Sequence, residues 1–180
     1  MITRSWAMPN KTTFEIKPIN QLIKKYHSMD RLWIDPFART NTFTCISNDL
    51  DVSFDTDHNV ESLKFMKMFE PMSVDGVFFD PPYSPRQIKE VYNGIGRKVQ
   101  KEDTQSQFWS ERKNAIAEVL KVGGLCMSFG WNSNGIGLSR GFELVEVLIV
   151  AHGGMHNDTI VTVERKTQHQ LKLNFEDEHE

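Results

Sequence analysis

The stretch VDGVFFDPPYSPRQ, residues 74–87, begins as a buried strand and then stops abruptly. Its first six residues form an apolar run with the length and composition of a strand inside a sheet. Two consecutive prolines then end the strand in a stiff loop, because proline lacks an N–H and fixes its own φ. Asp80 precedes the prolines and Tyr83 follows them. One interpretation is a plain turn with Asp80 as acceptor; the other is a functional loop.

The rest of the chain alternates between apolar runs and helical stretches, a pattern that favours an α/β fold. Such uninterrupted apolar strands predict a Rossmann-like, doubly wound, mostly parallel sheet covered on both faces. A Gly-Gly turn between the last two β-rich runs predicts an antiparallel C-terminal hairpin. The expected strands are residues 31–38, 43–47, 74–79, 125–130 and two runs within 142–165, and the expected helices are the second half of 5–26, 60–69 and 106–121.

This architecture gives the proline loop a location. In open α/β sheets, ligands bind beyond the carboxyl ends of the strands. If residues 74–79 form a central strand, Asp80 lies at a cleft.

Length and composition predict one domain, residues 1–170, with a flexible acidic tail at 171–180. The chain has 180 residues, of which 39% are hydrophobic. We find no apolar run of about 20 residues that would span a membrane. The first residues also lack the apolar centre of a signal peptide, so we expect a cytoplasmic protein.

Charge and cysteine content exclude some site classes. The net charge of −3 argues against binding nucleic acid through bulk charge alone, although residues 84–101 hold five basic residues against one acidic residue. Cys45 and Cys126 lie in apolar runs and are expected to be small buried side chains. Because no His/Cys cluster has zinc spacing, we expect no metal site.

At residues 80–83, DPPY, the chain resembles the S-adenosylmethionine-dependent amino-methyltransferases of DNA. Their catalytic motif is Asp or Asn, then Pro-Pro, then Tyr, Phe or Trp. The flanks are similar as well: DPFA at 35–38 resembles the first cofactor motif, and VLKVGGLCMSFGWNS at 119–133 resembles the next helix, turn and strand. The resemblance covers about residues 6–166, and the combination of motifs is similar to that of small adenine methyltransferases encoded by phages and prophages.

The resemblance implies roles for the four motif residues. The carboxylate of Asp80 and the backbone carbonyl of Pro81 would hold an exocyclic amine, whose lone pair is otherwise delocalised into the ring. Pro82 would keep the loop stiff. Tyr83 would stack on a base that has been taken out of the DNA stack.

The resemblance also implies S-adenosylmethionine as cofactor, without a metal. Asp49 is the expected ribose ligand, with Asp51 as its alternative, and Glu61 is expected near the adenine amine, with Asp57 as its alternative. Each could also be an ordinary loop or helix-start carboxylate. Residues 6–14 are expected to form a lid over the methionine end. The expected cofactor residues are Asp35, Pro36, Phe37, Ala38, Asp49, Glu61, Met8 and Pro9.

One departure from the family pattern lies in the first cofactor motif. Arg39 and Asn41 stand at two positions where the family usually has glycine. Glycine permits positive φ and close approach to a ligand. Asn41 could adopt the left-handed region, whereas Arg39 is harder to reconcile. The alternative to an enzyme is therefore a catalytically silent, nucleic-acid-binding relative.

These observations predict a methyltransferase that acts on the N6 amine of adenine in DNA, single-stranded or duplex. N4 of cytosine is the nearest alternative. No target-recognition domain is evident, so we expect short or loose specificity, with residues 84–101 and a second subunit contacting DNA; dimerisation is a hypothesis. His152 is a further candidate at the hairpin. The expected substrate residues are Ser84, Arg86, Lys89, Trp131, Asn132, His156 and Asn157.

Overall fold

The computed structural model describes residues 1–43, 45–82, 84–94, 96, 106–154 and 156–168. The strands are β1 (Ile2–Trp6), β2 (Trp33–Asp35), β3 (Ile46–Ser47), β4 (Val74–Phe79), β5 (Leu120–Gly130), β6 (Phe142–Ala151) and β7 (Thr159–Lys166). The helices are η1 (Thr13–Glu15), α1 (Lys17–Tyr26), α2 (Ser62–Met66), α3 (Pro85–Gly94), α4 (Ser106–Val119) and η3 (Leu138–Arg140).

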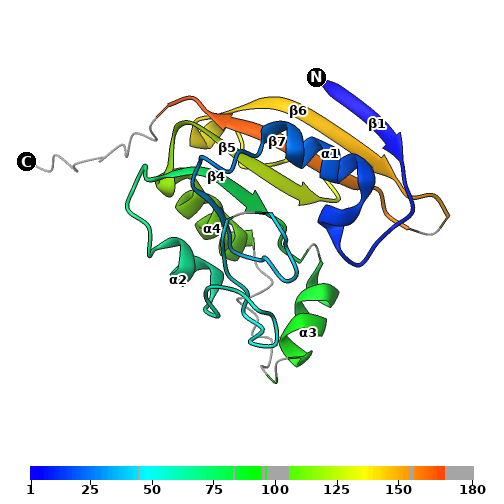
Figure 1. Cartoon of the computed structure of the whole chain (residues 1–180), viewed down its shortest axis with the longest axis horizontal. Helices are drawn as coiled ribbons and strands as arrows, with labels where there is room; N and C mark the ends of the chain where they lie inside the picture. Colours follow the sequence, from blue (N-terminus) through cyan, green and yellow to red (C-terminus); the bar gives the residue numbers. More distant parts are fainter. Residues whose placement is uncertain (44, 83, 95, 97–105, 155, 169–180) are drawn as a thin grey trace, which may run out of the picture.

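All seven strands form one sheet in the order β1-β6-β7-β5-β4-β2-β3 (Figure 1). Only β7 is antiparallel to its neighbours, β5 and β6, and the remaining pairs are parallel. The prediction of a mostly parallel sheet with an antiparallel C-terminal hairpin is confirmed. Because six strands run the same way, their carboxyl ends meet at one edge of the sheet.

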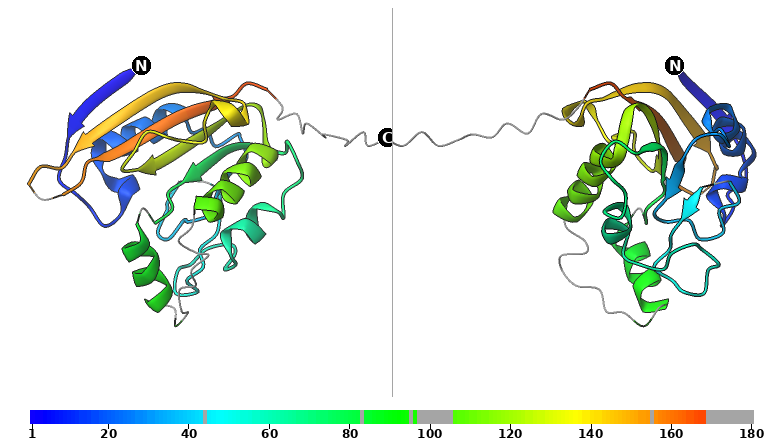
Figure 2. Two further views of the ribbon diagram at one scale, coloured as in Figure 1. Left: turned by 180° about the vertical axis from the view of Figure 1, so that it is seen from behind. Right: turned by 60° about the vertical axis from the view of Figure 1, so that its left-hand side comes forward.

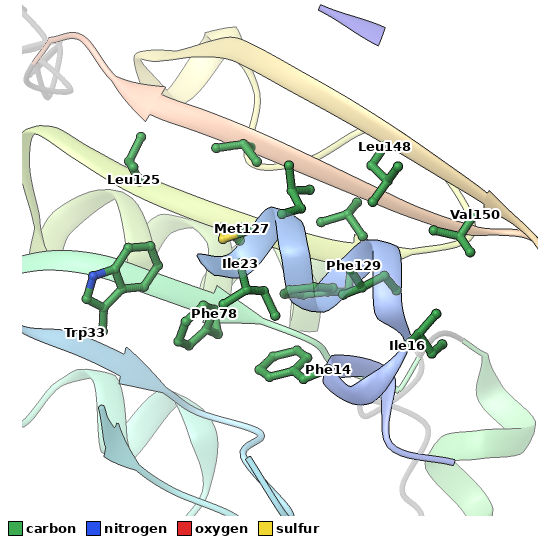
Figure 3. Close-up of a cluster of buried hydrophobic side chains, with 14 residues drawn as sticks. Phe14, Ile16, Ile23, Trp33, Phe78, Leu125, Met127, Phe129, Leu148 and Val150 are labelled. Atoms are coloured by element: carbon green, nitrogen blue, oxygen red, sulfur yellow. The ribbon is translucent and has the colours of Figure 1, made fainter. Parts of the chain in front are cut away.

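Helices cover both faces of the sheet (Figure 2). On one face, α1 buries Ile19, Leu22 and Ile23 as its apolar spacing predicts, against β5, β6 and β7. Phe14 of η1 joins the same cluster, where its ring lies 5.3 Å from that of Phe78 (Figure 3). On the other face, α2 and α4 pack against the opposite side chains of β4 and β5. Successive residues of β4 therefore serve two cores.

Several elements are shorter than predicted, for local reasons. The strand expected at 31–38 ends at Asp35, before Pro36, and the strand expected at 43–47 is reduced to Ile46–Ser47. The helix expected at 60–69 occupies only Ser62–Met66; Glu61 accepts hydrogen bonds from the backbone N–H groups of its first turn.

The helix expected at 106–121 ends at Val119, and β5 begins at the next residue. The buried ammonium of Lys166 donates to the carbonyl of Ala117 in the last turn of the helix and to that of Leu120 just after it. Gly123 follows inside β5 with φ of 86°. Helix α3 and strand β1 were not predicted.

Both cysteines are free thiols; Cys126 is buried and Cys45 is partly buried, outside β3. Among the described residues, we find no helix with the length and apolarity needed to cross a membrane.

Candidate active site

A cavity of about 760 Å³ lies at the edge of the sheet where the parallel strands end. The loops that follow β2, β3 and β4 supply Pro36, Asp49 and Asp80, and the loops that follow β5 and β6 supply Trp131 and His152. This is the edge at which ligands bind in open α/β sheets, and the volume is that of a typical ligand site.

The structure brings together most of the predicted site residues. Those that line the cavity are Asp80, Pro81, Pro82, Pro36, Phe37, Asp49, Glu61, Pro9, Trp131, His156 and Asn157. Those that do not line it are Asp35, Ala38, Met8, Ser84, Arg86, Lys89 and Asn132. Tyr83, the fourth motif residue, lies outside the described residues. So do residue 95 and residues 97–101 of the basic segment.

Asp35 lies beneath the cavity at the end of β2 and is 1% exposed. It accepts hydrogen bonds from the backbone N–H of Phe37 (3.0 Å) and from Nδ2 of Asn41 (2.8 Å). Burial, together with the negative charges of Asp80 and Asp49, nevertheless raises the pKa of Asp35 to about 8. Asp35 is thus a buried carboxylic acid under the acidic end of the site.

Asp49 lies in the loop after β3 and accepts hydrogen bonds from the backbone N–H groups of Asp51 (2.9 Å) and Arg39 (3.1 Å). Burial raises the pKa of Asp49, against the lowering effect of these bonds. Asp51 also lines the cavity, whereas Asp57 does not and instead accepts from Ser47. The carboxylate of Asp49 thereby joins the loop after β3 to Arg39 in the loop after β2.

The two departures from glycine behave differently from the prediction. Arg39, and not Asn41, takes positive φ, at 44°. Its N–H bond to Asp49 holds that conformation, while its guanidinium carbon lies 5.4 Å from the ring of Phe54. The Asn41 side chain instead links Asp35 to the backbone N–H of Phe43. The loop therefore has a glycine-like backbone at Arg39.

Glu61 lines the cavity but is also tied to the scaffold. It accepts from the backbone N–H of Leu63 (2.9 Å) and pairs with the guanidinium of Arg112 on α4, whose side chain is 3% exposed. Burial alone would raise the pKa of Glu61, but the Arg112 charge and the hydrogen bonds hold it below its ordinary value. Glu61 thus caps α2 and anchors α4 while facing the site.

Part of the expected lid, residues 6–14, lines the cavity through Pro9, Asn10, Lys11 and Thr13. Other cavity residues were missed by sequence reasoning. They include Leu50 and Phe54 in the loop after β3 and the aromatic pair Phe108 and Trp109 at the start of α4. They also include part of α3, where Gln87, Ile88, Val91 and Tyr92 line the cavity. The i, i+3, i+4 spacing of Ile88, Val91 and Tyr92 was a usable helix signal.

Within the described part of the chain, no group of three or more His, Cys, Asp or Glu side chains is arranged to hold a metal ion.

No protein-family model matches the chain, and no curated protein matches it. Several solved structures do match the chain. A putative methyltransferase, yhhF, from Escherichia coli is 11% identical with a TM-score of 0.54, covering 89% of each chain. A Methanosarcina mazei S-adenosylmethionine-dependent methyltransferase is 10% identical with a TM-score of 0.54, covering 81% of this chain and 97% of that one.

A third structure is the Burkholderia thailandensis 1,6-didemethyltoxoflavin-N1-methyltransferase with bound 1,6-didemethyltoxoflavin and S-adenosylhomocysteine. It is 10% identical with a TM-score of 0.51, covering 77% of this chain and 72% of that one. At such identities the likeness concerns the fold. The chain has the Rossmann-like fold of the class I methyltransferases.

Proposed function

We propose that this protein is an S-adenosylmethionine-dependent methyltransferase that modifies the N6 amine of adenine in DNA. The observation that carries the proposal is the position of Asp80, Pro81 and Pro82. They follow a central strand and line the same cavity as Asp49 and Glu61. The Asp-Pro-Pro part of the DPPY motif and two further carboxylates line one cavity on a methyltransferase fold, and this arrangement supports amine methylation.

The residues of the cavity fit S-adenosylmethionine chemically. The carboxylates of Asp49 and Asp51 are suitable acceptors for the two ribose hydroxyls. Phe37, Phe54 and Leu50 offer an apolar lining for an adenine ring. When bound, the cofactor supplies an electrophilic methyl group on a positively charged sulfur.

The loop after β4 would act on the target amine. The carboxylate of Asp80 and the carbonyl of Pro81 would accept its two N–H groups, which directs the lone pair away from the ring and out of conjugation. Asp35 is buried near Asp80, and when Asp35 is protonated it adds no second negative charge beside the Asp80 carboxylate. Stacking of the base on Tyr83 remains a prediction from the motif.

DNA is the proposed partner, and residues 1–170 are the proposed methyltransferase domain. Trp131, His156 and Asn157 line the cavity and could contact the base. Arg86 and Lys89 are exposed on α3 and do not line the cavity. We therefore propose that they contact DNA phosphates and not the target base. Arg86 also pairs with Glu90 at 2.8 Å, so its charge is partly balanced. A dimer in the cytoplasm remains part of the proposal.

The variants Asp80→Ala and Asp80→Asn test the assignment. Alanine removes the acceptor for the amine and should lower kcat by about 10²-fold or more, the effect of losing one preorganised catalytic hydrogen bond. Asparagine keeps an acceptor oxygen and should retain more activity than alanine. Calorimetry with S-adenosylhomocysteine should give similar affinities for all three proteins.

Three outcomes would count against all or part of the proposal. Full activity in Asp80→Ala would show that another group holds the amine. Absence of S-adenosylhomocysteine binding by the wild-type protein would favour the silent relative. Methylation of cytosine N4 in place of adenine N6 would correct the substrate and leave the residue assignment intact.

A further inference from the structure

The segment between β1 and α1, residues 7–16, borders the cavity and is bonded to the rest of the protein near each of its ends. We call it the strap. Four of its residues, Pro9, Asn10, Lys11 and Thr13, line the cavity, and Ile16 at its end does so as well. In Figure 1 the strap leaves the end of β1, runs down past the level of α1 and then turns back up to it.

The distal end of the strap is held by packing and by one side chain. Phe14 and Ile16 are buried in the core beneath α1 (Figure 3). Nδ2 of Asn20 donates to the carbonyl of Phe14 at 3.0 Å. The middle of the strap is braced internally, because Asn10 bonds both Glu15 and the backbone N–H of Thr12.

The proximal end is held at Ala7, whose backbone N–H donates to the carbonyl of Ala151 at the end of β6 at 3.1 Å. It is also held by His152, which lies in the loop between β6 and β7 and is 7% exposed. Its Nδ1 lies 2.8 Å from the carbonyl oxygen of Ala7, and its Nε2 lies 2.8 Å from Oγ1 of Thr159. A carbonyl can only accept, so Nδ1 carries the proton. Thr159 can then donate its hydroxyl to Nε2. Both ring nitrogens thus form hydrogen bonds: Nδ1 bonds to the strap, and Nε2 bonds to Thr159 at the start of β7.

We propose that His152 is a positioning residue that makes the strap and the β6–β7 loop move as one unit. His156 and Asn157, the proposed base contacts, lie in the same loop, and Pro9, a proposed cofactor contact, lies in the strap. His152 therefore connects the two sides of the cavity. The identity of the ligands in this inference rests on the proposed function. The link that His152 makes between the strap and the loop does not depend on it.

This role differs from contact with the base, the alternative for a histidine that lines the cavity. An imidazole whose two nitrogens are both engaged at 2.8 Å has no donor or acceptor left for a ligand. Linking two ligand-binding segments also makes their ordering mutually dependent. Binding on one side then reduces the entropy cost of binding on the other.

Amide hydrogen exchange on His152→Ala tests the connection without any substrate. We expect faster exchange both in the strap, at Lys11 and Thr12, and in the loop, at Gly153 and His156, by about five-fold, the effect of losing one hydrogen bond. Trypsin cleavage after the exposed Lys11 should accelerate by a similar factor. His152→Asn, whose amide can replace the Nδ1 donor, should restore the strap but not the bond to Thr159.

Asn20→Ala is the matched control, because it removes a side-chain bond to the carbonyl at the other end of the strap. Because His152 still joins the two segments in this variant, Asn20→Ala should loosen the strap and, to a smaller extent, the loop. If His152→Ala loosens only the loop, or neither segment, the proposal is wrong.

A kinetic measurement tests the consequence. His152→Ala should raise the KM for S-adenosylmethionine about five-fold, and His152→Asn should largely restore it. An unchanged KM, or failure of His152→Asn to restore it, would overturn the coupling of the two sides. Failure of the wild-type protein to methylate DNA would refute the proposed function, and the exchange experiment would still decide the role of His152.

Discussion

Asp35 is a carboxylic acid enclosed by protein at the end of β2, with two further carboxylates nearby. Removing it from water disfavours its charged form more than its two hydrogen bonds favour it. The native state therefore binds the Asp35 proton more tightly than the unfolded chain does. Its contribution to stability is complete below the ordinary pKa of 3.8 and is lost as the pH rises through about 8.

The variant Asp35→Asn should remove this dependence. Between pH 4 and pH 8 the free energy of unfolding of the wild type should fall, relative to the variant, by up to about 1.4 kcal/mol per pH unit, the slope for one proton. Urea unfolding across this range measures the difference. Asp55→Asn, at an exposed position, is the control and should follow the wild type. Parallel curves for wild type and Asp35→Asn would contradict the shifted pKa.

Arg39 carries a Cβ in a backbone region that glycine prefers, with φ of 44°. The left-handed region costs a residue with a Cβ roughly 1–2 kcal/mol. The bond from its N–H to Asp49 and the position of its guanidinium over Phe54 offset part of that cost. The guanidinium also places a positive charge at the cavity lining.

Two substitutions at Arg39 isolate the backbone cost. Arg39→Gly and Arg39→Ala both lose the guanidinium, but only alanine keeps the Cβ. The glycine variant should therefore be more stable than the alanine variant by about 1 kcal/mol in thermal or urea unfolding. Greater stability of the alanine variant would mean that the positive φ is not retained in solution.

At the scale of elements, β4 is central because it serves both cores and also carries the Asp80 loop. Its pairing with β2 depends on Gly76, which lies against the indole of Trp33. A Cβ at Gly76 would lie 2.2 Å from Cδ2 of Trp33. The indole is 1% exposed and has no room to withdraw.

Gly76→Ala should consequently destabilise the protein by about 3 kcal/mol, the upper part of the range for overpacking a core. Gly94→Ala is its control: a Cβ at Gly94, the last residue of α3, would meet nothing within 4 Å. That variant should change stability by less than about 1 kcal/mol. Equal stability of the two variants in urea unfolding would be inconsistent with the packing of β4 on β2.

The elements also show what sequence could predict. The predictions of a strand at VDGVFF and of a hairpin of β6 and β7 are confirmed, because the apolar runs and turn residues behind them are local signals. Strand β1 was missed, since its side chains alternate between exposed and partly buried and its partner β6 lies about 145 residues away. Helix α4 was extended too far because its end depends on Lys166, a distant residue that supplies the capping ammonium.

At the scale of the whole molecule, parallel strands explain why distant motifs meet. Each motif residue follows the carboxyl end of its own strand, so predicting the sheet was sufficient to predict that Pro36, Asp49 and Asp80 share a cavity. The strap largely coincides with the lid expected at residues 6–14 from the family resemblance. The aromatic start of α4 reaches the cavity through tertiary packing, so Trp109 has no signature in the local sequence.

The central claim is that this cavity transfers a methyl group to the N6 amine of adenine in DNA. The direct measurement incubates the protein with DNA and S-adenosylmethionine carrying a deuterated methyl group, followed by mass spectrometry of the nucleosides. The account predicts labelled N6-methyladenine, and none when Asp80 is replaced by alanine. Label that appears only in RNA or protein, or no label from a wild-type protein that binds the cofactor, would contradict it.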